Sequence, residues 1–547
     1  MEKKPEVRSV NGGKIWDKSF ERCSVSVYVP NNDLRDDVLN YGFLAPYILV
    51  MSNSRMKDDE LVIFAKEKGF EKMAKEFGSS VVFVSPNSAN GWDDASPDIL
   101  DEIITNSKIH QYFEEGMAKA YNRFTKQLEG YFIRGAIFRI CMYGFGKSAD
   151  YLAKHAIRHF EGDGLWGRAD CAPTFISLSE LNVIPDIQSD DIPIAYYGND
   201  KDIIDTVSAK AKYTIIKDKE DFYTDFHNFA KQFRRMCGQL ELDPDLEKDG
   251  MVIEPGVFVT KTSPDNDGDD RGTKEHSIGY FAFYNKDIEN NNVPLLISFH
   301  GGGDSAMYIA HVSGWAKIAH KYGFLLVSIE DHLNSTATEM KALIEKLKED
   351  YNIDASRIYV SGFSMGGCKS WDMIQEYPEI LAAAAPMDAT FEVGLNVFGQ
   401  PVKKDINKDI AVPVFYVGGE LTPLPELPFQ AQKCIDRIEY VFNINKVPVE
   451  YKVKLEEADE WQNKIWGIDG NAIVKIKDPD RQGILTLQLF ESADGKCYTV
   501  LGSVDNQGHE CREHTCEMAW KYMSGYRRVN GTVEALTIDE VKKTLCQ

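Results

Sequence analysis

The chain has 547 residues and a formal net charge of −23, from 85 acidic and 62 basic side chains. A length of about three typical domains predicts two or three domains, and the 43% of hydrophobic residues can fill full-sized cores. The acidic balance argues against nucleic acid and against anionic membrane surfaces as partners, because both require basic patches.

No apolar run approaches the roughly 18–20 residues that span a bilayer, and the first residues carry charge without the apolar core of a secretory signal. The ten cysteines include no C-x-x-C pair, which favours free thiols over a zinc or redox site. The Asp-rich stretch 263–272 lacks the glutamate that completes a calcium loop, so we interpret it as a solvated hairpin loop. We therefore expect a cytoplasmic protein without a metal or cofactor.

The first half alternates between strand-like and helix-like segments. Strands are predicted at 23–30, 43–52, 80–86 and 137–143, and helices at 60–77 and 103–128. The last of these strands runs directly into a glycine-containing turn. Such alternation is typical of an α/β fold with a mostly parallel sheet flanked by helices.

The second half repeats the plan of the first. The matched segments, in the same order, are 45–50 with 293–298, 77–84 with 322–329, 143–146 with 361–364, and 192–200 with 412–420. Several matches in one order indicate a tandem duplication. We predict two α/β domains, 1–245 and 246–547, that pack on each other; whether the chain forms a homo-oligomer is not indicated by the sequence.

Residues 362–366, Gly-Phe-Ser-Met-Gly, fit the pattern G-x-S-x-G between a strand-like run and a helix-like segment. In that context the pattern is typical of a nucleophile elbow, a turn so tight that it needs small neighbours and lifts the serine hydroxyl above the sheet. We predict Ser364 as a nucleophile. The matched residue of the first half is Gly146, so we expect that half to lack the nucleophile. A displaced nucleophile at Ser148 is the alternative.

A glycine-rich segment, 300–303, follows a strand-like run with the sequence His-Gly-Gly-Gly. Loops of this type supply an oxyanion-hole amide, since glycine lets a backbone N–H approach the substrate oxygen. We predict that amides near Gly302 and of Met365 bind the oxyanion, and that His300 and Gly301 border the substrate. A plain glycine-rich turn is the alternative.

His509 lies in a loop between a strand-like run and the last long helix-like segment, where an imidazole can reach the serine of an elbow. We predict that it acts as the general base, with His514, one turn into the helix, as the alternative. The acid that orients the base is expected after the preceding matched strand, and Glu420 is the first choice there. Glu426 in the same loop and Asp388 are the other candidates.

The segment 450–496 is an insertion of the second half relative to the first, with strand-like runs and two tryptophans. We hypothesise that it packs beside the active site and that Trp466 lines an acyl or alcohol pocket. A β-rich embellishment remote from the site is the alternative.

These motifs resemble those of the α/β-hydrolase superfamily over about residues 275–547. The runs PLLISFHGGG and DASRIYVSGFSMGG, a strand-end acid and a late GHE are most similar to the polyhydroxybutyrate-depolymerase and feruloyl-esterase-like branch of serine esterases. The resemblance implies an α/β-hydrolase domain and a serine esterase that cleaves a small-molecule ester through an acyl-enzyme. The first half resembles the same fold more faintly, which with the duplication predicts two tandem α/β-hydrolase-like domains, the first degenerate. That branch carries its acid as Asp in an H-G-x-x-D run, whereas this chain has Val417-Gly418-Gly419-Glu420.

Two other functions stay open from the residues alone. A prolyl-oligopeptidase-like peptidase shares the order of serine, acid and histidine, although no blade-like repeat precedes the hydrolase-like half. A non-catalytic binding protein would require the loss of chemistry in the first half to extend to the whole chain. The intact Ser364, His509 and glycine loop of the second half argue against that.

Overall fold

The chain forms two compact units, each built around one large sheet. The computed structural model describes residues 6–546 apart from 32–45, 107–120, 123–126, 129–134, 165–166, 191, 229–245, 262–274, 289–291, 303, 331, 333–334, 397–398, 400, 403, 423 and 480–482. Unit 1 comprises Met1–Gln239 and Asp269–Ser277, and unit 2 comprises Leu240–Gly268 and Ile278–Gln547. The Asp-rich loop predicted at 263–272 and most of the helix predicted at 103–128 lie outside the described residues. Of the described part of that helix, 103–106 is helical, whereas 121–122 and 127–128 form short strands, so the prediction is wrong there.

The sheet of unit 1 has the strand order β1-β2-β3-β5-β4-β8-β11-β12-β13. Its strands are β1 (Arg8–Val10), β2 (Gly13–Ser19), β3 (Cys23–Pro30), β4 (Pro46–Met51), β5 (Val81–Pro86), β8 (Ala136–Phe145), β11 (Pro173–Ser179), β12 (Ile194–Tyr197) and β13 (Thr214–Lys217). From β5 to β13 the strands run parallel, whereas β1, β2 and β3 pair antiparallel. Two short pairs stand apart, β6 (Tyr121–Asn122) with β7 (Gln127–Leu128) and β9 (Phe160–Gly164) with β10 (Gly167–Cys171).

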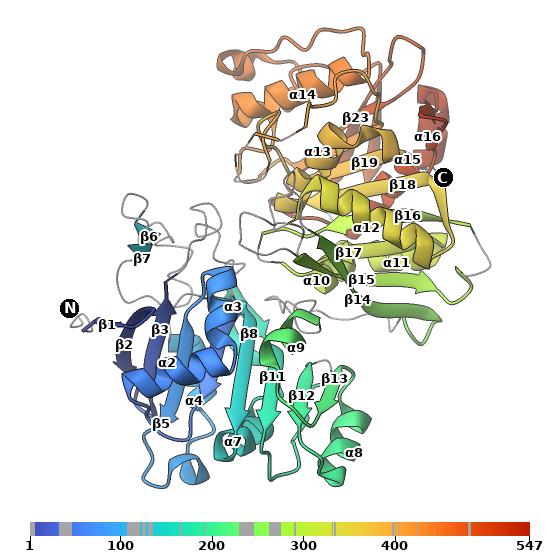
Figure 1. Cartoon of the computed structure of the whole chain (residues 1–547). Coiled ribbons are helices and arrows are strands. Elements are labelled where there is room, and N and C mark those ends of the chain that lie inside the picture. Colours follow the sequence, from blue (N-terminus) through green and yellow to red (C-terminus); the bar gives the residue numbers. More distant parts are fainter. Residues whose placement is uncertain are drawn as a thin grey trace. The chain divides into compact units, whose positions relative to one another are not determined.

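Helices cover both faces of this sheet (Figure 1). They are α2 (Asp58–Glu67), α3 (Phe70–Phe77), α4 (Ile99–Asn106), α7 (Lys147–His155), α8 (Lys201–Lys210) and α9 (Phe222–Asn228), with a 3-10 turn η2 (Gly91–Asp94). In α3 the residues Phe70, Met73, Ala74 and Phe77 are buried. Their spacing of three and four places them on one helix face, which packs against the sheet.

The sheet of unit 2 has the order β14-β15-β17-β16-β18-β19-β20-β23-β22-β21. Its strands are β14 (Met251–Lys261), β15 (Glu275–Asn285), β16 (Val293–Phe299), β17 (Leu325–Ile329), β18 (Ile353–Phe363), β19 (Ala383–Met387), β20 (Val414–Gly419), β21 (Ala472–Lys477), β22 (Ile484–Phe490) and β23 (Thr499–Val504). The strands from β17 to β23 run parallel, and β15, β22 and β21 pair antiparallel to their neighbours. The strand-like runs of the predicted insertion therefore extend one edge of the main sheet as β21 and β22.

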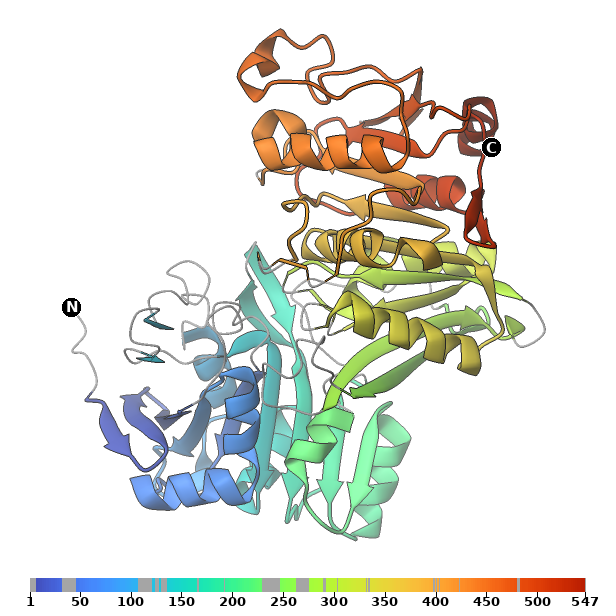
Figure 2. The same cartoon turned by 45° about the horizontal axis from the view of Figure 1, so that its top comes forward.

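The helices of unit 2 also lie on both faces of its sheet, as Figure 2 shows for α12, α13 and α14 on one side and α15 on the other. The helices are α10 (Ala306–Val312), α11 (Trp315–Tyr322), α12 (Ala337–Asp350), α13 (Met365–Glu376), α14 (Gln432–Ile444), α15 (Glu513–Met523) and α16 (Ile538–Cys546). The remaining elements are a hairpin, β24 (Arg527–Val529) with β25 (Thr532–Glu534), and the 3-10 turns η7 (Pro378–Ile380), η8 (Pro428–Gln430) and η9 (Leu455–Glu460).

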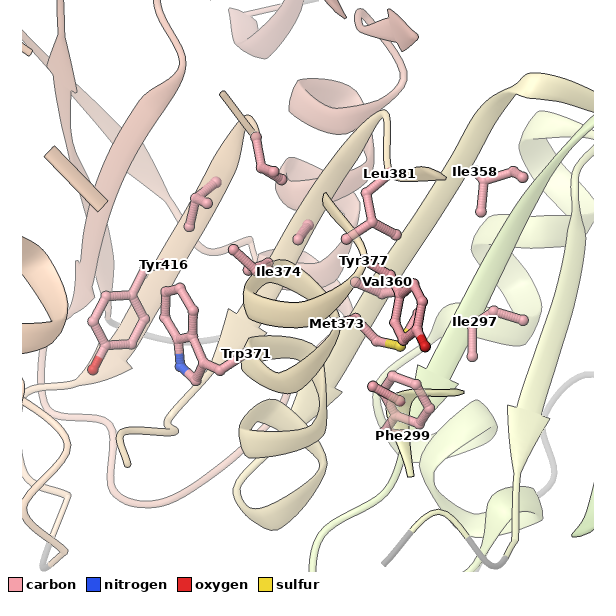
Figure 3. Packing of buried hydrophobic residues seen from close by; sticks show 14 of the residues in the cluster. Ile297, Phe299, Ile358, Val360, Trp371, Met373, Ile374, Tyr377, Leu381 and Tyr416 are labelled. Carbon is pink, nitrogen blue, oxygen red and sulfur yellow. The ribbon is translucent and has the colours of Figure 1, made fainter. Parts of the chain in front are cut away.

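Side chains of the central strands in unit 2 point alternately to the two faces of the sheet and pack against the helices on each face. Ile297 and Val360 face α13, where Trp371 packs edge-on to Tyr416 with ring centroids 5.4 Å apart (Figure 3). Tyr359, the residue directly before Val360 in β18, points to the opposite face of the sheet, where its ring contacts Trp520 of α15. Because successive strand side chains point to opposite faces, strands covered on both sides are apolar throughout.

The prediction of mostly parallel sheets flanked by helices is confirmed. The order β3-β5-β4-β8-β11-β12-β13 in unit 1 has the same sequence of positions and strand directions as β15-β17-β16-β18-β19-β20-β23 in unit 2. Among the described helices, none is both long and apolar enough to cross a membrane.

Candidate active site

Five neighbouring parallel strands of unit 2 end at one edge of the sheet, and the predicted site residues follow these ends. The strand β16 leads into His300, β18 into Ser364, β19 into Asp388, β20 into Glu420, and β23 into the loop of His509. Carboxyl ends of adjacent parallel strands meet at the same edge of a sheet, where α/β proteins place their sites. The fold thus gathers motifs that are far apart in the sequence.

Ser364 occupies a strained turn between β18 and α13. Its backbone has φ 54° and ψ −121°, a conformation that residues with a side chain rarely adopt, and its N–H donates to the Met387 carbonyl at 3.0 Å. The turn tolerates no side chain two residues before or two residues after the serine, because a Cβ on Gly362 would overlap the Gly366 carbonyl and one on Gly366 would overlap the Phe299 carbonyl. These are the features of a nucleophile elbow.

The amide of Met365 is suited to bind an oxyanion. Met365 is the first residue of α13, and N–H groups in the first turn of a helix have no acceptor within the helix. In the glycine loop, the N–H of Gly301 donates to the Asp304 carboxylate at 3.1 Å, so this amide is already engaged. Gly302, partly exposed, is left as the candidate for the second donor.

His300 is buried under the glycine loop. Its Nδ1 lies 2.6 Å from the Gly301 carbonyl oxygen and its Nε2 lies 2.8 Å from the Glu330 carbonyl oxygen. The imidazole therefore ties the loop to the end of β17. The structure gives His300 a role in shaping this loop, and its predicted contact with substrate stays a prediction.

His509 lies in the loop between β23 and α15, as predicted. Its ring packs on Phe363, the residue before the nucleophile, with centroids 4.6 Å apart. Its Nδ1 lies 3.4 Å from the Thr422 hydroxyl oxygen. Burial lowers the pKa of His509 to about 4, so the imidazole is neutral at neutral pH and can accept a proton. Within the described residues, no hydrogen bond joins His509 to Ser364 in this structure.

The two glutamates predicted as acids lie in the loop after β20. Glu420 is partly exposed and its carboxylate accepts the Asn506 N–H at 3.1 Å, three residues before His509. Glu426 is buried, and its Oε2 atom has no hydrogen-bond partner among the described residues. Burial and the nearby Asp388 carboxyl raise the pKa of Glu426 to about 8. The structure brings Glu420 to the histidine loop but not into contact with the ring.

Asp388, the third candidate, connects two loops. One carboxylate oxygen accepts the Gly419 N–H at 2.7 Å and the other accepts the Glu510 N–H at 3.2 Å. Its backbone has φ 43°, directly after β19. Burial raises the pKa of Asp388 to about 7, while the two N–H donors act to lower it. Asp388 thus holds the loop after β20 and the loop of His509 at fixed positions.

The structure places two other predicted residues, Trp466 and Ser148, in buried positions. Trp466 is buried in the core with its ring 5.8 Å from that of Tyr416, so contact with a substrate would require the core to open. Ser148 is buried in unit 1 and its hydroxyl donates to the Phe145 carbonyl at 2.9 Å, which is the geometry of a helix-start contact. His514 lies in the first turn of α15.

Two residues of the site were missed by reasoning from the sequence. Thr422 carries a hydroxyl and not the carboxylate that a triad pattern predicts beside the base. Phe363 was treated only as a variable position of the elbow pattern, although its ring supports the imidazole. A signal for Thr422 existed, since it lies only two residues beyond the strand-end Glu420.

The strand order, the elbow and the histidine loop together define an α/β-hydrolase fold in unit 2. No family model matches the chain. The chain is 33% identical over 137 residues to the "Bifunctional acetylxylan esterase/xylanase XynS20E" of Neocallimastix patriciarum. The matched segment covers 23% of this chain and 19% of that protein. The chain is 26% identical over 115 residues to "Poly(3-hydroxyalkanoate) depolymerase C" of Paucimonas lemoignei, covering 18% and 28% of the two chains.

Among solved structures, "Acetyl xylan esterase from Aspergillus awamori" matches 49% of this chain and 99% of its own, with a TM-score of 0.33 and 12% identity. The chain spans about a fifth of the length of the first curated relative and under a third of the second.

Proposed function

We propose that the chain is a serine hydrolase that cleaves a carboxylic ester through an acyl-enzyme on Ser364. The observation that carries the proposal is the elbow, in which Ser364 has φ 54° and is followed by the unengaged first-turn amides of α13. An ordinary strand-to-helix turn has no need for this conformation at a non-glycine residue. The similarity to a protein named as a bifunctional acetylxylan esterase/xylanase supports the same reaction.

The proposed reaction uses these groups in the following order. His509, neutral at neutral pH, takes the proton of Ser364 as the serine oxygen attacks the ester carbonyl. The amides of Met365 and Gly302 bind the oxygen that becomes negative, and each such donor typically contributes about 3–4 kcal/mol. The protonated His509 then gives its proton to the leaving alcohol, and water releases the acid by the reverse sequence. These steps use side chains and amides of the chain alone.

For unit 1 we favour a degenerate hydrolase-like domain without a nucleophile. Gly146, between β8 and α7, has φ 56° and ψ −126°, close to the angles of Ser364. Its N–H donates to the Ser179 carbonyl at 3.0 Å, at the end of the next strand, as that of Ser364 does to Met387. The shared strand order supports a duplication in which the elbow persists and the serine is absent.

A fluorophosphonate probe tests the proposal directly. We expect one adduct per chain, located at Ser364 by peptide mass spectrometry, and none in a Ser364→Ala variant. A panel of aryl acetates, acetylated xylan, feruloyl esters and aminoacyl amides then defines the class. Turnover of the amides in preference to esters would favour a peptidase. The absence of any adduct and any turnover would favour a binding protein.

A cytoplasmic location also stays a proposal, based on the expectation drawn from the sequence. Fractionation of the producing cells checks it, with the protein expected in the cytoplasmic fraction.

A further inference from the structure

The imidazole of His509 presents its Nδ1 atom to a hydroxyl group. The Thr422 Oγ1 atom lies 3.4 Å from Nδ1 of His509. Within the described residues, the imidazole makes no other hydrogen bond. Catalytic hydrogen bonds of this length are common before substrate binds. A base of this kind needs an acceptor on Nδ1, so that Nε2 carries the lone pair that takes the serine proton.

Thr422 is held firmly in that place. Its side chain is 3% exposed and its N–H donates to the Gly419 carbonyl at 3.2 Å. Its own carbonyl accepts the side-chain amide of Gln430 at 2.8 Å. The oxygen of the same Gln430 amide accepts the N–H groups of Glu426 and Leu427. One side chain therefore closes the loop, and the Thr422 hydroxyl has little freedom to leave the imidazole.

The neighbouring carboxylates are used for other contacts. Asp388 and Glu420 accept backbone N–H groups, and within the described residues no hydrogen bond joins either carboxylate, or that of Glu426, to the ring of His509. Burial is the cause that lowers the pKa of His509, with no carboxylate acting to raise it. The Thr422 hydroxyl thus contacts Nδ1 where a triad would place a carboxylate.

Building on the proposed esterase function, we propose that Thr422 is the positioning residue of His509 and takes the place that a carboxylate holds in a Ser–His–acid triad. The hydroxyl oxygen accepts the Nδ1 proton and so fixes the tautomer and the ring plane. During acyl transfer the Ser364 proton moves to Nε2, the serine oxygen bonds to the carbonyl carbon, and the proton passes to the leaving alcohol. Because the hydroxyl is neutral, it stabilises the imidazolium less than a carboxylate does.

Three substitutions at this position test the proposal on the full chain, with an aryl acetate as substrate. Thr422→Val keeps the shape and removes the acceptor, so we expect kcat to fall at least about tenfold with KM changed less than about twofold. Thr422→Ser keeps the hydroxyl, so we expect it to retain most of the kcat that Thr422→Val loses. Thr422→Asp places a charge beside Nδ1, so the acidic limb of the kcat/KM profile moves up by about one pH unit or more.

One further variant serves as a control. Thr390→Val removes another buried hydroxyl, which contacts Tyr416 and the Glu426 carbonyl, and we expect it to lower Tm without moving the pH profile. Glu420→Gln is a competing test, because a loss of rate and a shifted acidic limb in this variant would favour the strand-end acid over Thr422.

The outcomes separate this proposal from the esterase assignment. An unmodified chain with neither ester turnover nor fluorophosphonate adduct contradicts the proposed function. An active chain in which Thr422→Val keeps the full kcat contradicts only the role of Thr422. The same holds if Glu420→Gln, and not the Thr422 variants, alters the rate and the acidic limb. Should Thr422→Asp fail to fold, the contrast between Thr422→Val and Thr422→Ser still decides.

Discussion

Burial controls the charge of His509, the proposed base. An exposed histidine has a pKa of about 6.5, and burial lowers that of His509 to about 4. Folding therefore disfavours protonation of the His509 imidazole at acidic pH. The contribution of this group to stability is complete above pH 6.5 and is lost as the pH falls through about 4, because the unfolded chain binds the proton more tightly.

The activity should follow the same titration. The base must be neutral to accept the serine proton, so we expect kcat/KM to rise through about pH 4 and to reach a plateau by pH 5.5. An ordinary histidine would leave the enzyme about one-tenth active at that pH. A pH–rate profile with an aryl acetate checks this, and an acidic limb centred near pH 6.5 would contradict it.

Asp388 offers a second test at the scale of one residue. Asn fits the same backbone, since it tolerates positive φ as Asp does, but its NH₂ group would face the N–H of Gly419 or of Glu510. We expect Asp388→Asn to lose about 1–3 kcal/mol of stability, because one buried donor is left without an acceptor, and to lower kcat more than KM is changed. Thermal unfolding and steady-state kinetics measure both; unchanged Tm and kcat would contradict the anchoring role.

At the scale of elements, the site depends on how closely β16, β18 and α13 approach one another. The approach requires glycine where backbone meets backbone. A Cβ on Gly366 would overlap the Phe299 carbonyl and lie 2.6 Å from the His300 carbonyl. The elbow and the glycine loop are therefore packed as one structure, and a change in either shifts both the nucleophile and the oxyanion donors.

Gly366→Ala tests this packing. We expect it to destabilise unit 2 by about 1–3 kcal/mol, as overpacking does, and to reduce fluorophosphonate labelling of Ser364. The matched control is Gly508→Ala, where an added Cβ meets nothing within 4 Å and φ is not positive. Differential scanning calorimetry compares the two variants. Equal Tm values for both would show that the elbow can absorb the extra methyl group.

The parts of this site differ in how far the sequence predicts them. Ser364 and the glycine loop are recognisable because their function needs a local backbone conformation, which leaves a short pattern. His509 follows from its order along the chain. The position of Thr422 just beyond a strand end places it near the site, but its contact with His509 depends on where two loops point their side chains, which the sequence does not reveal. Trp466 is buried by the core, which an aromatic-rich insertion does not reveal in advance.

At the scale of the whole molecule, the two sheets share an order of strands but differ at the elbow. Unit 2 has serine at the strained position and unit 1 has glycine, with nearly equal φ and ψ. A Cβ on Gly146 would meet the Asn53 and Glu180 side chains at 3.5 and 3.8 Å, ordinary contact distances. The turn in unit 1 could therefore hold a side chain at the expense of backbone strain alone.

Gly146→Ser tests whether geometry alone makes a nucleophile. We expect the variant to fold with a loss of about 1–3 kcal/mol from the positive φ and to gain no second fluorophosphonate adduct, because an elbow serine without a placed base is a weak nucleophile. Intact mass spectrometry after labelling counts the adducts. Two adducts per chain would show that unit 1 retains a complete site.

The glycine at this elbow has an evolutionary consequence. Replacing a strained serine by glycine relieves the backbone, so a hydrolase copy that is no longer selected for catalysis gains stability at the step that disables it. The return to serine is uphill, and it brings no benefit until a base is also in place. A duplicated hydrolase domain would therefore tend to lose its nucleophile early and to keep it lost, while the turn itself survives as part of the scaffold.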